Sequence, residues 1–486
     1  MNEAATRLEP NAVWTHFEEL NAVPRPSKKE GRVIEFMKQF GEGLNLETIV
    51  DDIGNVIIRK PATPGMEDCQ GVILQGHLDM VHQKNADTVF DFETEGIRSV
   101  ITEDGWLTAE GTTLGADNGM GVASIMAVLS ATDIEHGQVE ALFTIDEETG
   151  MTGAFKLQPG ILTGSILLNT DTEDEGELCI GCAGGIDTNI KANYEQVPLG
   201  EGTAFKISVK GLRGGHSGCE IHLGRGNANK IMNRLLWEGA KNFGLRIASL
   251  DGGSLRNAIP RESFAIVVVD SEQVDPFKKY IAETIGVIQT ELIRTEPDLM
   301  ASIEPAPPVD SVMDATSQKN LIHAIYAAPC GVARMSDEMP GLVETSTSLA
   351  RVLVESGSIL VQFLTRSSVE TARDDLARTI ESAFQVAGAN VEHAGGYPGW
   401  KPNADSEILR QMTQIYSDLF GVEPTVNAVH AGLECGIIGS VYPGLDMISF
   451  GPTIKNPHSP DEKCEIASVK KYWDYLVATL RQIPKK

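Results

Sequence analysis

The sequence has few cysteines and no long apolar segment. Its 486 residues include seven cysteines, an odd number scattered along the chain, which is typical of reduced thiols in a cytosol rather than of a disulfide framework. It contains no run of 18 apolar residues, so we expect no membrane-spanning helix. The first residues, MNEAATRLEP, lack the basic and then apolar pattern of a signal peptide. We therefore expect a cytoplasmic protein.

Basic side chains are scarce. The chain has 40 Lys and Arg against 68 Asp and Glu, a net charge of −28, which argues against nucleic acid or an anionic membrane as a partner. The apolar share of 42% is that of an ordinary globular protein. The length predicts two domains, or conceivably three.

One pair of cysteines has metal-site spacing. Cys179 and Cys182 form a C-x-x-C in CIGCAGG, but a structural zinc site needs a second pair and none follows. We interpret both as packing residues.

Helical and strand patterns alternate at the two ends of the chain, and the middle has a different character. We expect a layered α/β domain from the ends and an α+β insertion between them. The expected helices of the ends span 12–27, 28–45, 117–131, 406–421 and 468–483, and the strands 55–60, 71–76, 140–146, 165–171 and 446–453. The middle combines β-rich segments at 203–218 and 263–275 with amphipathic helices at 276–295, 313–329 and 371–388.

The stretch VILQGHLDMVHQ ends an apolar strand with a histidine and an aspartate two residues apart. Because side chains alternate along a strand, His77 and Asp79 lie on the same side. This is the geometry in which a carboxylate orients a metal-bound imidazole. The alternative is a polar strand end at the surface.

Further metal-type ligands follow strands or Gly-rich turns in the same way. Open α/β sheets place ligand sites at the carboxyl ends of their strands, so these side chains are expected to converge. Carboxylates gathered in one cleft cannot all stay ionised without cations, and histidines with carboxylates suit a pair of zinc ions, with cobalt or manganese as substitutes. The residues are Asp117 in LGADNGMG, Glu147 and Glu148 in ALFTIDEETG, Asp171 in ILLNTDTEDEGE, and His458 in GPTIKNPHSPDE.

Each of these residues also has a simpler interpretation. Asp117 fits a helix N-cap or a turn. Glu147 and Glu148 fit a solvated helix start. Asp171 lies in an acidic run whose members are mostly at the surface, and His458 fits a loop histidine between prolines.

The order and spacing of these motifs resemble the dizinc aminoacylase and glutamate-carboxypeptidase superfamily. Within it, the segments GLRGGHSGCEIHLGRGNANK, GGSLRNAIPRE and HAGLECGII resemble the aminoacyl-histidine dipeptidase (Xaa-His dipeptidase, peptidase D) branch. The resemblance covers nearly the whole chain. It implies a phosphorylase/hydrolase-like layered α/β catalytic domain, formed by 1–190 and 395–486, with an inserted α+β lid domain at 191–394.

The resemblance also implies a role for each residue of the metal centre. Two zinc ions per chain are expected, and the bridging aspartate is expected to precede a cis peptide, here Asp117–Asn118. Asp79 would orient a ligand, and Glu147 would act as general base on a metal-bridging water. One ion would take His77, Asp117 and Asp171, and the other Asp117, Glu148 and His458.

The lid and substrate residues follow from the same resemblance. His216 in GGHSG would donate a hydrogen bond to the tetrahedral oxyanion. The alternative for this segment is a buried histidine in a turn. A phosphate loop fits less well, because the segment lacks the Gly-Lys-Ser/Thr ending. Arg366 would bind the substrate carboxylate, with a surface arginine as the alternative. Asn257 would also contact substrate, and Glu434 with the backbone of Gly432 would receive the free α-amine.

The implied activity is metal-dependent hydrolysis of unblocked dipeptides, including Xaa-His and β-alanyl-histidine, by a homodimer. An amine-binding acid and a carboxylate-binding arginine together would select dipeptides. The alternatives are a deacylase acting on N-acyl amino acids, against which Glu434 speaks, and an inactive peptide or metal sensor. The segment VETSTSLARV has Ser348 and Arg351 where the branch has an Asn after Thr-Ser, and we assign it no role.

Overall fold

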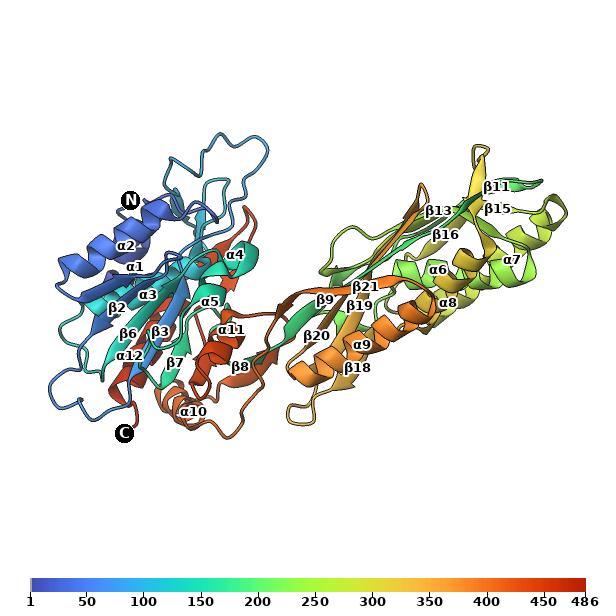
Figure 1. Cartoon of the computed structure of the whole chain (residues 1–486). Helices are drawn as coiled ribbons and strands as arrows, with labels where there is room; N and C mark the ends of the chain where they lie inside the picture. Colours follow the sequence, from blue (N-terminus) through green and yellow to red (C-terminus); the bar gives the residue numbers. More distant parts are fainter. Residues whose placement is uncertain (1) are drawn as a thin grey trace. The chain divides into compact units, whose positions relative to one another are not determined.

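The computed structural model describes residues 2–486, which form two compact units (Figure 1). The first unit comprises the chain up to Gly181 together with Pro402–Ala428 and Leu433–Lys486. The second comprises Cys182–Lys401 and Val429–Gly432. The functional names, catalytic domain and lid domain, stay predictions.

The first unit is built on an eight-stranded sheet. Its central strands β6, β3, β7 and β23 run parallel to one another. The residues of β3, β6 and β7 are all buried, as in strands covered on both faces. In sheet order, the strands are β1 (Glu47–Val50), β2 (Val56–Lys60), β6 (Val139–Thr144), β3 (Val72–His77), β7 (Ile166–Asn169), β23 (Asp446–Ser449), β8 (Glu177–Cys182) and β22 (Thr425–Val429).

The helices of the first unit include all those expected at the two ends of the chain. Helix α3 is buried almost all round, and its Met120 and Ala123 pack against Trp14 and Phe17 of α1. The helices are η1 (Ala5–Arg7), α1 (Asn11–Asn21), α2 (Gly31–Gly43), α3 (Ala116–Ser130), α4 (Glu147–Gly150), α5 (Thr152–Lys156), α10 (Glu407–Phe420), α11 (Glu434–Val441) and α12 (Ile466–Arg481). A small sheet adds β24 (Ile454–Lys455), β25 (Lys463–Glu465), β5 (Trp106–Ala109) and β4 (Ser99–Ile101).

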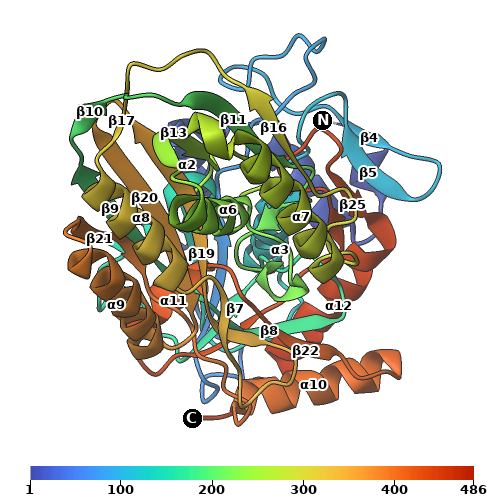
Figure 2. The same cartoon turned by 90° about the vertical axis from the view of Figure 1, so that its right-hand side faces the viewer.

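The second unit is an antiparallel sheet with helices on one face (Figure 2). Its nine strands are β16 (Met300–Pro305), β11 (Thr203–Lys210), β15 (Ser263–Val269), β13 (Arg246–Gly252), β19 (Val343–Glu355), β20 (Ser358–Ser367), β9 (Gly184–Asn193) and β21 (Asn390–Tyr397), with β18 (Gly331–Met335) paired to β19. Two short ladders join β10 (Gln196–Pro198) to β17 (Ser311–Met313), and β12 (Gly215–His216) to β14 (Ala258–Ile259). The helices are η2 (Ile221–Leu223), α6 (Ala228–Asn242), η3 (Ser271–Gln273), α7 (Val274–Glu291), α8 (Ala315–Ala327) and α9 (Glu370–Val386).

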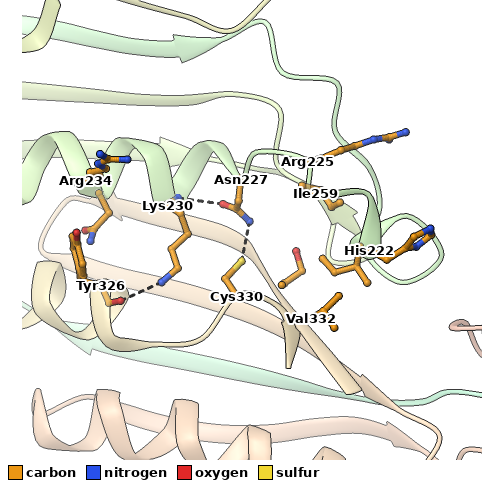
Figure 3. A pocket seen from close by; sticks show the side chains of 14 residues that line it. His222, Arg225, Asn227, Lys230, Arg234, Ile259, Tyr326, Cys330 and Val332 are labelled. Carbon is orange, nitrogen blue, oxygen red and sulfur yellow. Dashed lines mark hydrogen bonds between the residues drawn. The ribbon is translucent and has the colours of Figure 1, made fainter. Parts of the chain in front are cut away.

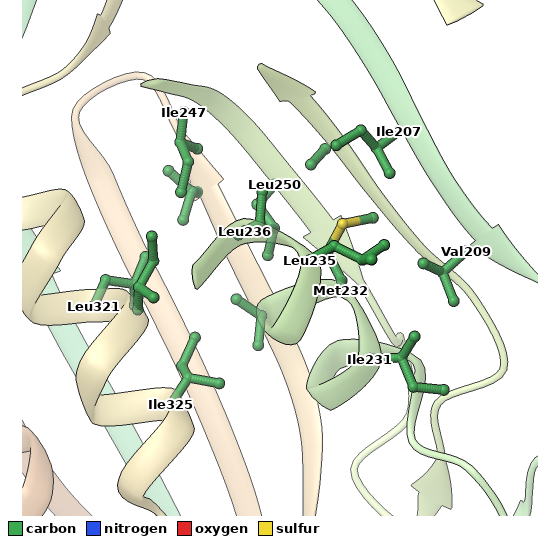
Figure 4. Close-up of a cluster of buried hydrophobic side chains, with 14 of the residues drawn as sticks. Ile207, Val209, Ile231, Met232, Leu235, Leu236, Ile247, Leu250, Leu321 and Ile325 are labelled. Atoms are coloured by element: carbon green, nitrogen blue, oxygen red, sulfur yellow. The ribbon is translucent and has the colours of Figure 1, made fainter. Parts of the chain in front are cut away.

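The core of the second unit lies between its helices and its sheet. Figure 4 shows Met232 and Leu235 of α6 between Leu321 of α8 and Ile207 of β11. Helix α6 begins where the side chain of Asn227 accepts hydrogen bonds from two backbone N–H groups of the first turn. The α+β character expected for the middle of the chain is confirmed.

Two local expectations can be checked directly. Among the described residues no helix is long and apolar enough to cross a bilayer. The peptide bond between Asp117 and Asn118 is cis.

Candidate metal centre

The sequence-predicted ligands of the first unit meet at one edge of its sheet. His77 is the last residue of β3, Glu147 follows β6, and Asp171 follows β7. His458 comes after β23. Because β6, β3, β7 and β23 are parallel neighbours, their carboxyl ends bring these residues to the same edge, where open α/β sheets hold ligands.

Asp117 lies between two groups of ligand atoms. Its Oδ1 is 3.1 Å from His77 Nε2, which is also 3.3 Å from Asp171 Oδ1. Its Oδ2 is 3.2 Å from His458 Nε2, which is also 2.9 Å from Glu148 Oε2. In each group of three residues the ligand atoms lie within 4.8 Å of one another. Each oxygen of the Asp117 carboxylate thus faces a different group of possible metal-ligating side chains.

The carboxylate and imidazole side chains at this edge of the sheet fit divalent cations. Glu148 Oε1 is buried and accepts no hydrogen bond, so it has a lone pair left for a cation. Burial, with the nearby charges of Asp117 and Glu148, raises the pKa of Asp171 to about 6. Imidazoles with carboxylates are the ligand types of zinc. The residues therefore fit the metal pair expected from the sequence.

Asp79 supports both a ligand and the loop after β6. Its Oδ1 lies 3.4 Å from His77 Nδ1, and the hydroxyl of Ser27 donates to its Oδ2 at 2.8 Å. The backbone N–H groups of Glu147 and Glu148 donate to the same carboxylate, at 3.0 and 3.3 Å. Asp79 is fully buried, and its backbone carbonyl lies 3.2 Å from His77 Nδ1, so the carbonyl and the carboxylate fix the His77 ring while the carboxylate fixes the start of α4.

Glu147 borders the ligand atoms. One of its carboxylate oxygens lies within 4.8 Å of a His77 ring nitrogen and of a Glu148 oxygen. Burial raises its pKa well above the ordinary glutamate value, and the charges of Asp171 and Glu434 add to this shift. A carboxylate of raised pKa beside the ligands has the chemistry of a proton acceptor and donor.

Glu434, the first residue of α11, is buried near these residues. Its Oε2 accepts hydrogen bonds from Gln75 Nε2 at 2.7 Å and from Thr144 Oγ1 at 2.6 Å, while its Oε1 has no partner. Burial raises its pKa to about 7. It therefore has an acceptor oxygen free for a cationic group.

In the second unit, His216 and Arg366 lie together. Arg366 Nη2 is 3.4 Å from His216 Nε2, and Nη1 donates to the hydroxyl of Tyr397 at 2.7 Å. The N–H groups of Gly218 and Cys219 donate to His216 Nδ1, and Arg366, which can only donate, faces Nε2, so both ring nitrogens face hydrogen-bond donors. Burial, and then the Arg366 guanidinium, lower the pKa of His216 to about 4.

Asn257 and Gly432, the remaining predicted substrate residues, are described by the positions of their backbones. The carbonyl of Asn257 accepts from the N–H of Ser217 at 2.8 Å, beside the β12–β14 ladder that contains His216. Asn257 itself is exposed. Gly432 lies in the short segment Val429–Gly432 that belongs to the second unit. Arg351, to which no role is assigned, pairs with Asp251 and the carbonyl of Gly253.

A hollow of about 600 Å³ in the second unit contains none of the predicted site residues (Figure 3). It lies beside the first turns of α6 and includes Ser348, Lys230 and Arg234 in its lining. Lys230 already donates to backbone carbonyls at the end of α8, and Arg234 pairs with Glu291 at 2.7 Å. Because these two cationic side chains already have partners within the protein, the hollow gives no reason to place the reaction there.

Reasoning from the sequence missed the uncharged groups that support the acids. Ser27 donates to Asp79, and Gln75 and Thr144 donate to Glu434. Gln75 had a usable signal, because it is a polar residue inside an apolar strand. Ser27 had none, since its partner is 52 residues away in the chain.

Comparison with known proteins agrees with this arrangement. The model of peptidase family M20/M25/M40 matches residues 73–482. The chain belongs to this peptidase family. A relative within the family is the cytosol non-specific dipeptidase of Escherichia coli K12, which is 43% identical over 483 residues, 99% of each chain.

Solved structures show the same fold. The crystal structure of an aminoacylhistidine dipeptidase from Vibrio alginolyticus superposes with a TM-score of 0.94 at 45% identity, covering 99% of this chain and 98% of that one. The aminopeptidase PepT of Bacillus cereus gives a TM-score of 0.58 at 16% identity, covering 98% and 99%, and shows the fold alone. The layered α/β fold class predicted from the sequence, with its α+β second part, is confirmed.

Proposed function

We propose that the chain is a metal-dependent dipeptidase that hydrolyses unblocked dipeptides, including Xaa-His and β-alanyl-histidine. The observation that carries the proposal is the position of Asp117 between two sets of histidine and carboxylate donors, with Glu147 beside them. The relatives at 43% and 45% identity are named as dipeptidases, which supports the same reaction class.

The chain's own ligands would hold two zinc ions, for which cobalt or manganese would substitute. His77, Asp117 and Asp171 form one set, and Asp117, Glu148 and His458 the other. When bound, the ions would polarise the scissile carbonyl and acidify the attacking water.

Glu147 is the proposed general base. Its carboxylate takes a proton from the attacking water and later gives it to the nitrogen of the leaving amine. Asp79 holds the backbone N–H of Glu147 and faces the His77 ring, so it fixes base and ligand relative to each other. His216 would donate to the oxygen that gains charge as the water attacks.

Substrate length would be set by two charged side chains. The unpartnered Oε1 of Glu434 suits the free α-amine of a dipeptide. Arg366 is 4% exposed, and its planar guanidinium suits the terminal carboxylate. The backbone of Gly432 and the side chain of Asn257 are further proposed contacts. A free amine at one end and a free carboxylate at the other define an unblocked dipeptide.

Two further parts of the proposal rest on the resemblance and the relatives. We propose a cytosolic location, which the name of the Escherichia coli relative gives for that protein. A homodimer stays a prediction. The deacylase alternative is not favoured, because an N-acyl substrate has no amine to pair with Glu434.

The test is release of free histidine from Ala-His and β-Ala-His, with N-acetyl-Ala-His as the matched blocked substrate. We expect the zinc-loaded chain to cleave the two free-amine dipeptides and to leave the acetylated one. Chelator treatment should abolish release, and added zinc should restore it. Cleavage of the acetylated substrate at a similar rate would contradict the dipeptidase and favour the deacylase.

A further inference from the structure

The buried carboxylate of Glu462 accepts hydrogen bonds from the backbone of Asp117 and of the residues just before it. Glu462 is 2% exposed, and its two oxygens accept hydrogen bonds from four consecutive backbone N–H groups. The donors are Leu114 at 2.8 Å, Gly115 at 2.9 Å, Ala116 at 2.8 Å and Asp117 at 3.2 Å. N–H groups at the start of a helix have no partner within the helix, and here one side chain satisfies those of the first two residues of α3 and of the two residues before it.

A buried arginine binds the same segment through its carbonyl. Arg25 is 1% exposed, and its Nη2 donates to the carbonyl of Gly115 at 2.6 Å. Its Nη1 donates to the carbonyls of Leu78 and Asp79, both at 3.2 Å. Arg25 therefore ties the loop that follows His77 to the loop that presents Asp117.

The glycines of LGADNG provide the space for this arginine. A Cβ atom added to Gly115 would lie 2.5 Å from Arg25 Nη2, and one added to Gly119 would lie 2.7 Å from the same atom. Gly115 also has a φ of +70°, which side-chain-bearing residues rarely adopt. The two glycines thus admit the guanidinium to the backbone on either side of Asp117.

We propose that Glu462 and Arg25 are positioning residues for the metal centre, which hold the segment 114–117 so that Asp117 serves both sets of ligands at once. The inference rests on the proposed function. A bridging carboxylate has to satisfy two sets of bond directions with one side chain, so motion of its backbone would weaken both. The two residues bind opposite polar groups of the segment, Glu462 its N–H groups and Arg25 the carbonyl of Gly115.

The test compares two buried glutamates that both accept backbone N–H groups in the first unit. Glu140 is 1% exposed and accepts from Thr163 and Gly164, both at 2.7 Å, and it lies at the start of β6 rather than at the ligand edge. Glu462→Gln and Glu140→Gln make the same chemical change in the two places. The readouts are the zinc affinity of the metal-free chain, by competition with a chromophoric chelator, and the visible spectrum of the cobalt-loaded chain.

We expect Glu462→Gln to weaken zinc binding by about 10–100-fold and to change the cobalt spectrum, because groups that orient metal ligands have effects of this size. Glu140→Gln should lower thermal stability but keep both metal readouts. Arg25→Lys keeps the charge but loses the planar fork, and it should also weaken zinc binding, which tests the inference even if Glu462→Gln does not fold.

Two results would contradict the inference in different ways. Tight zinc binding by the wild-type chain, with unchanged affinity and cobalt spectrum in the folded Glu462 or Arg25 variant, would refute the positioning role alone. Absence of zinc binding by the wild-type chain would refute the proposed function, and the inference with it.

Discussion

The carboxylate of Asp79 accepts a hydrogen bond from the backbone N–H of Glu147 at 3.0 Å. The two residues follow neighbouring parallel strands, β3 and β6, and are 68 positions apart in the chain. Since the same carboxylate faces His77 Nδ1 at 3.4 Å, one buried side chain links a proposed metal ligand to the proposed general base.

Replacing Asp79 should therefore reduce the rate more than it changes substrate binding. We expect Asp79→Asn to lower kcat by about 10–100-fold with a small change in KM, because the variant keeps the side-chain size and loses the acceptor charge. The comparison is Ser27→Ala, which removes one hydrogen bond to the same carboxylate and should have a smaller effect. Equal effects of the two variants on kcat would contradict the linking role of Asp79.

The adjacent residues Glu147 and Glu148 should behave differently when each is changed to Gln. We expect Glu147→Gln to lose about 10²–10⁴-fold in kcat while retaining its metal, since it loses the proton acceptor. Glu148 lies 2.9 Å from His458 in one ligand set, so Glu148→Gln should lose metal as well as activity. Metal analysis of both purified proteins, beside their kinetics, decides the assignment. A Glu147 variant that lost metal and a Glu148 variant that kept it would reverse the two roles.

Arg366 should control recognition of the substrate carboxylate. We expect Arg366→Lys to raise KM for Ala-His by about 10-fold or more, because a charge-assisted hydrogen bond contributes about 1.5–3 kcal/mol. Arg373 offers a matched control, since it is also largely buried and donates to the carbonyl of Tyr397 at 2.7 Å. The KM of Arg373→Lys should stay near that of the wild type. If KM is unchanged in both variants, Arg366 does not bind the substrate carboxylate.

The stability of the second unit should decrease in acid because of His430. Burial, followed by the charges of Arg366 and His216, lowers the pKa of His430 to about 3. His430 is 6% exposed, and its Nε2 lies 2.8 Å from Ser346 Oγ. The unfolded chain has an ordinary histidine pKa of about 6.5, so below that pH the unfolded state takes up a proton that the folded state excludes.

The free energy of unfolding should consequently fall by on the order of 2 kcal/mol between pH 7 and pH 5 from this residue. Urea unfolding of the metal-free chain at the two pH values measures the change. We expect His430→Gln to show a smaller pH dependence than the wild type, and a variant of the exposed His323 to match the wild type. The same pH dependence in all three proteins would show that His430 does not titrate in this way.

The parts of the site that the sequence predicts are those set by strand ends. His77 ends one, and Asp171 closely follows the other, of two apolar segments that become neighbouring parallel strands, so their convergence needed only the rule for carboxyl ends. The assignment of Asp117 as the shared ligand came from the order of motifs and the resemblance. Its letters alone favour a turn or a helix cap.

The parts that the sequence does not predict are contacts between backbone groups and distant side chains. Glu462 binds N–H groups 345–348 positions away, and such donors are present in every segment whatever its sequence. Arg25 likewise binds carbonyls, which every residue carries. The contacts of His216 Nδ1 are also with the N–H groups of Gly218 and Cys219, which only the folded turn aims at its ring.

The most direct test of metal-dependent dipeptide hydrolysis is to titrate the metal-free chain with zinc while measuring release of histidine from Ala-His. The account predicts no release without metal, a rise as zinc is added, and a plateau at two ions per chain, since Asp117 belongs to two groups of residues that could hold a metal. Full release before zinc is added, or none at saturation, would contradict it.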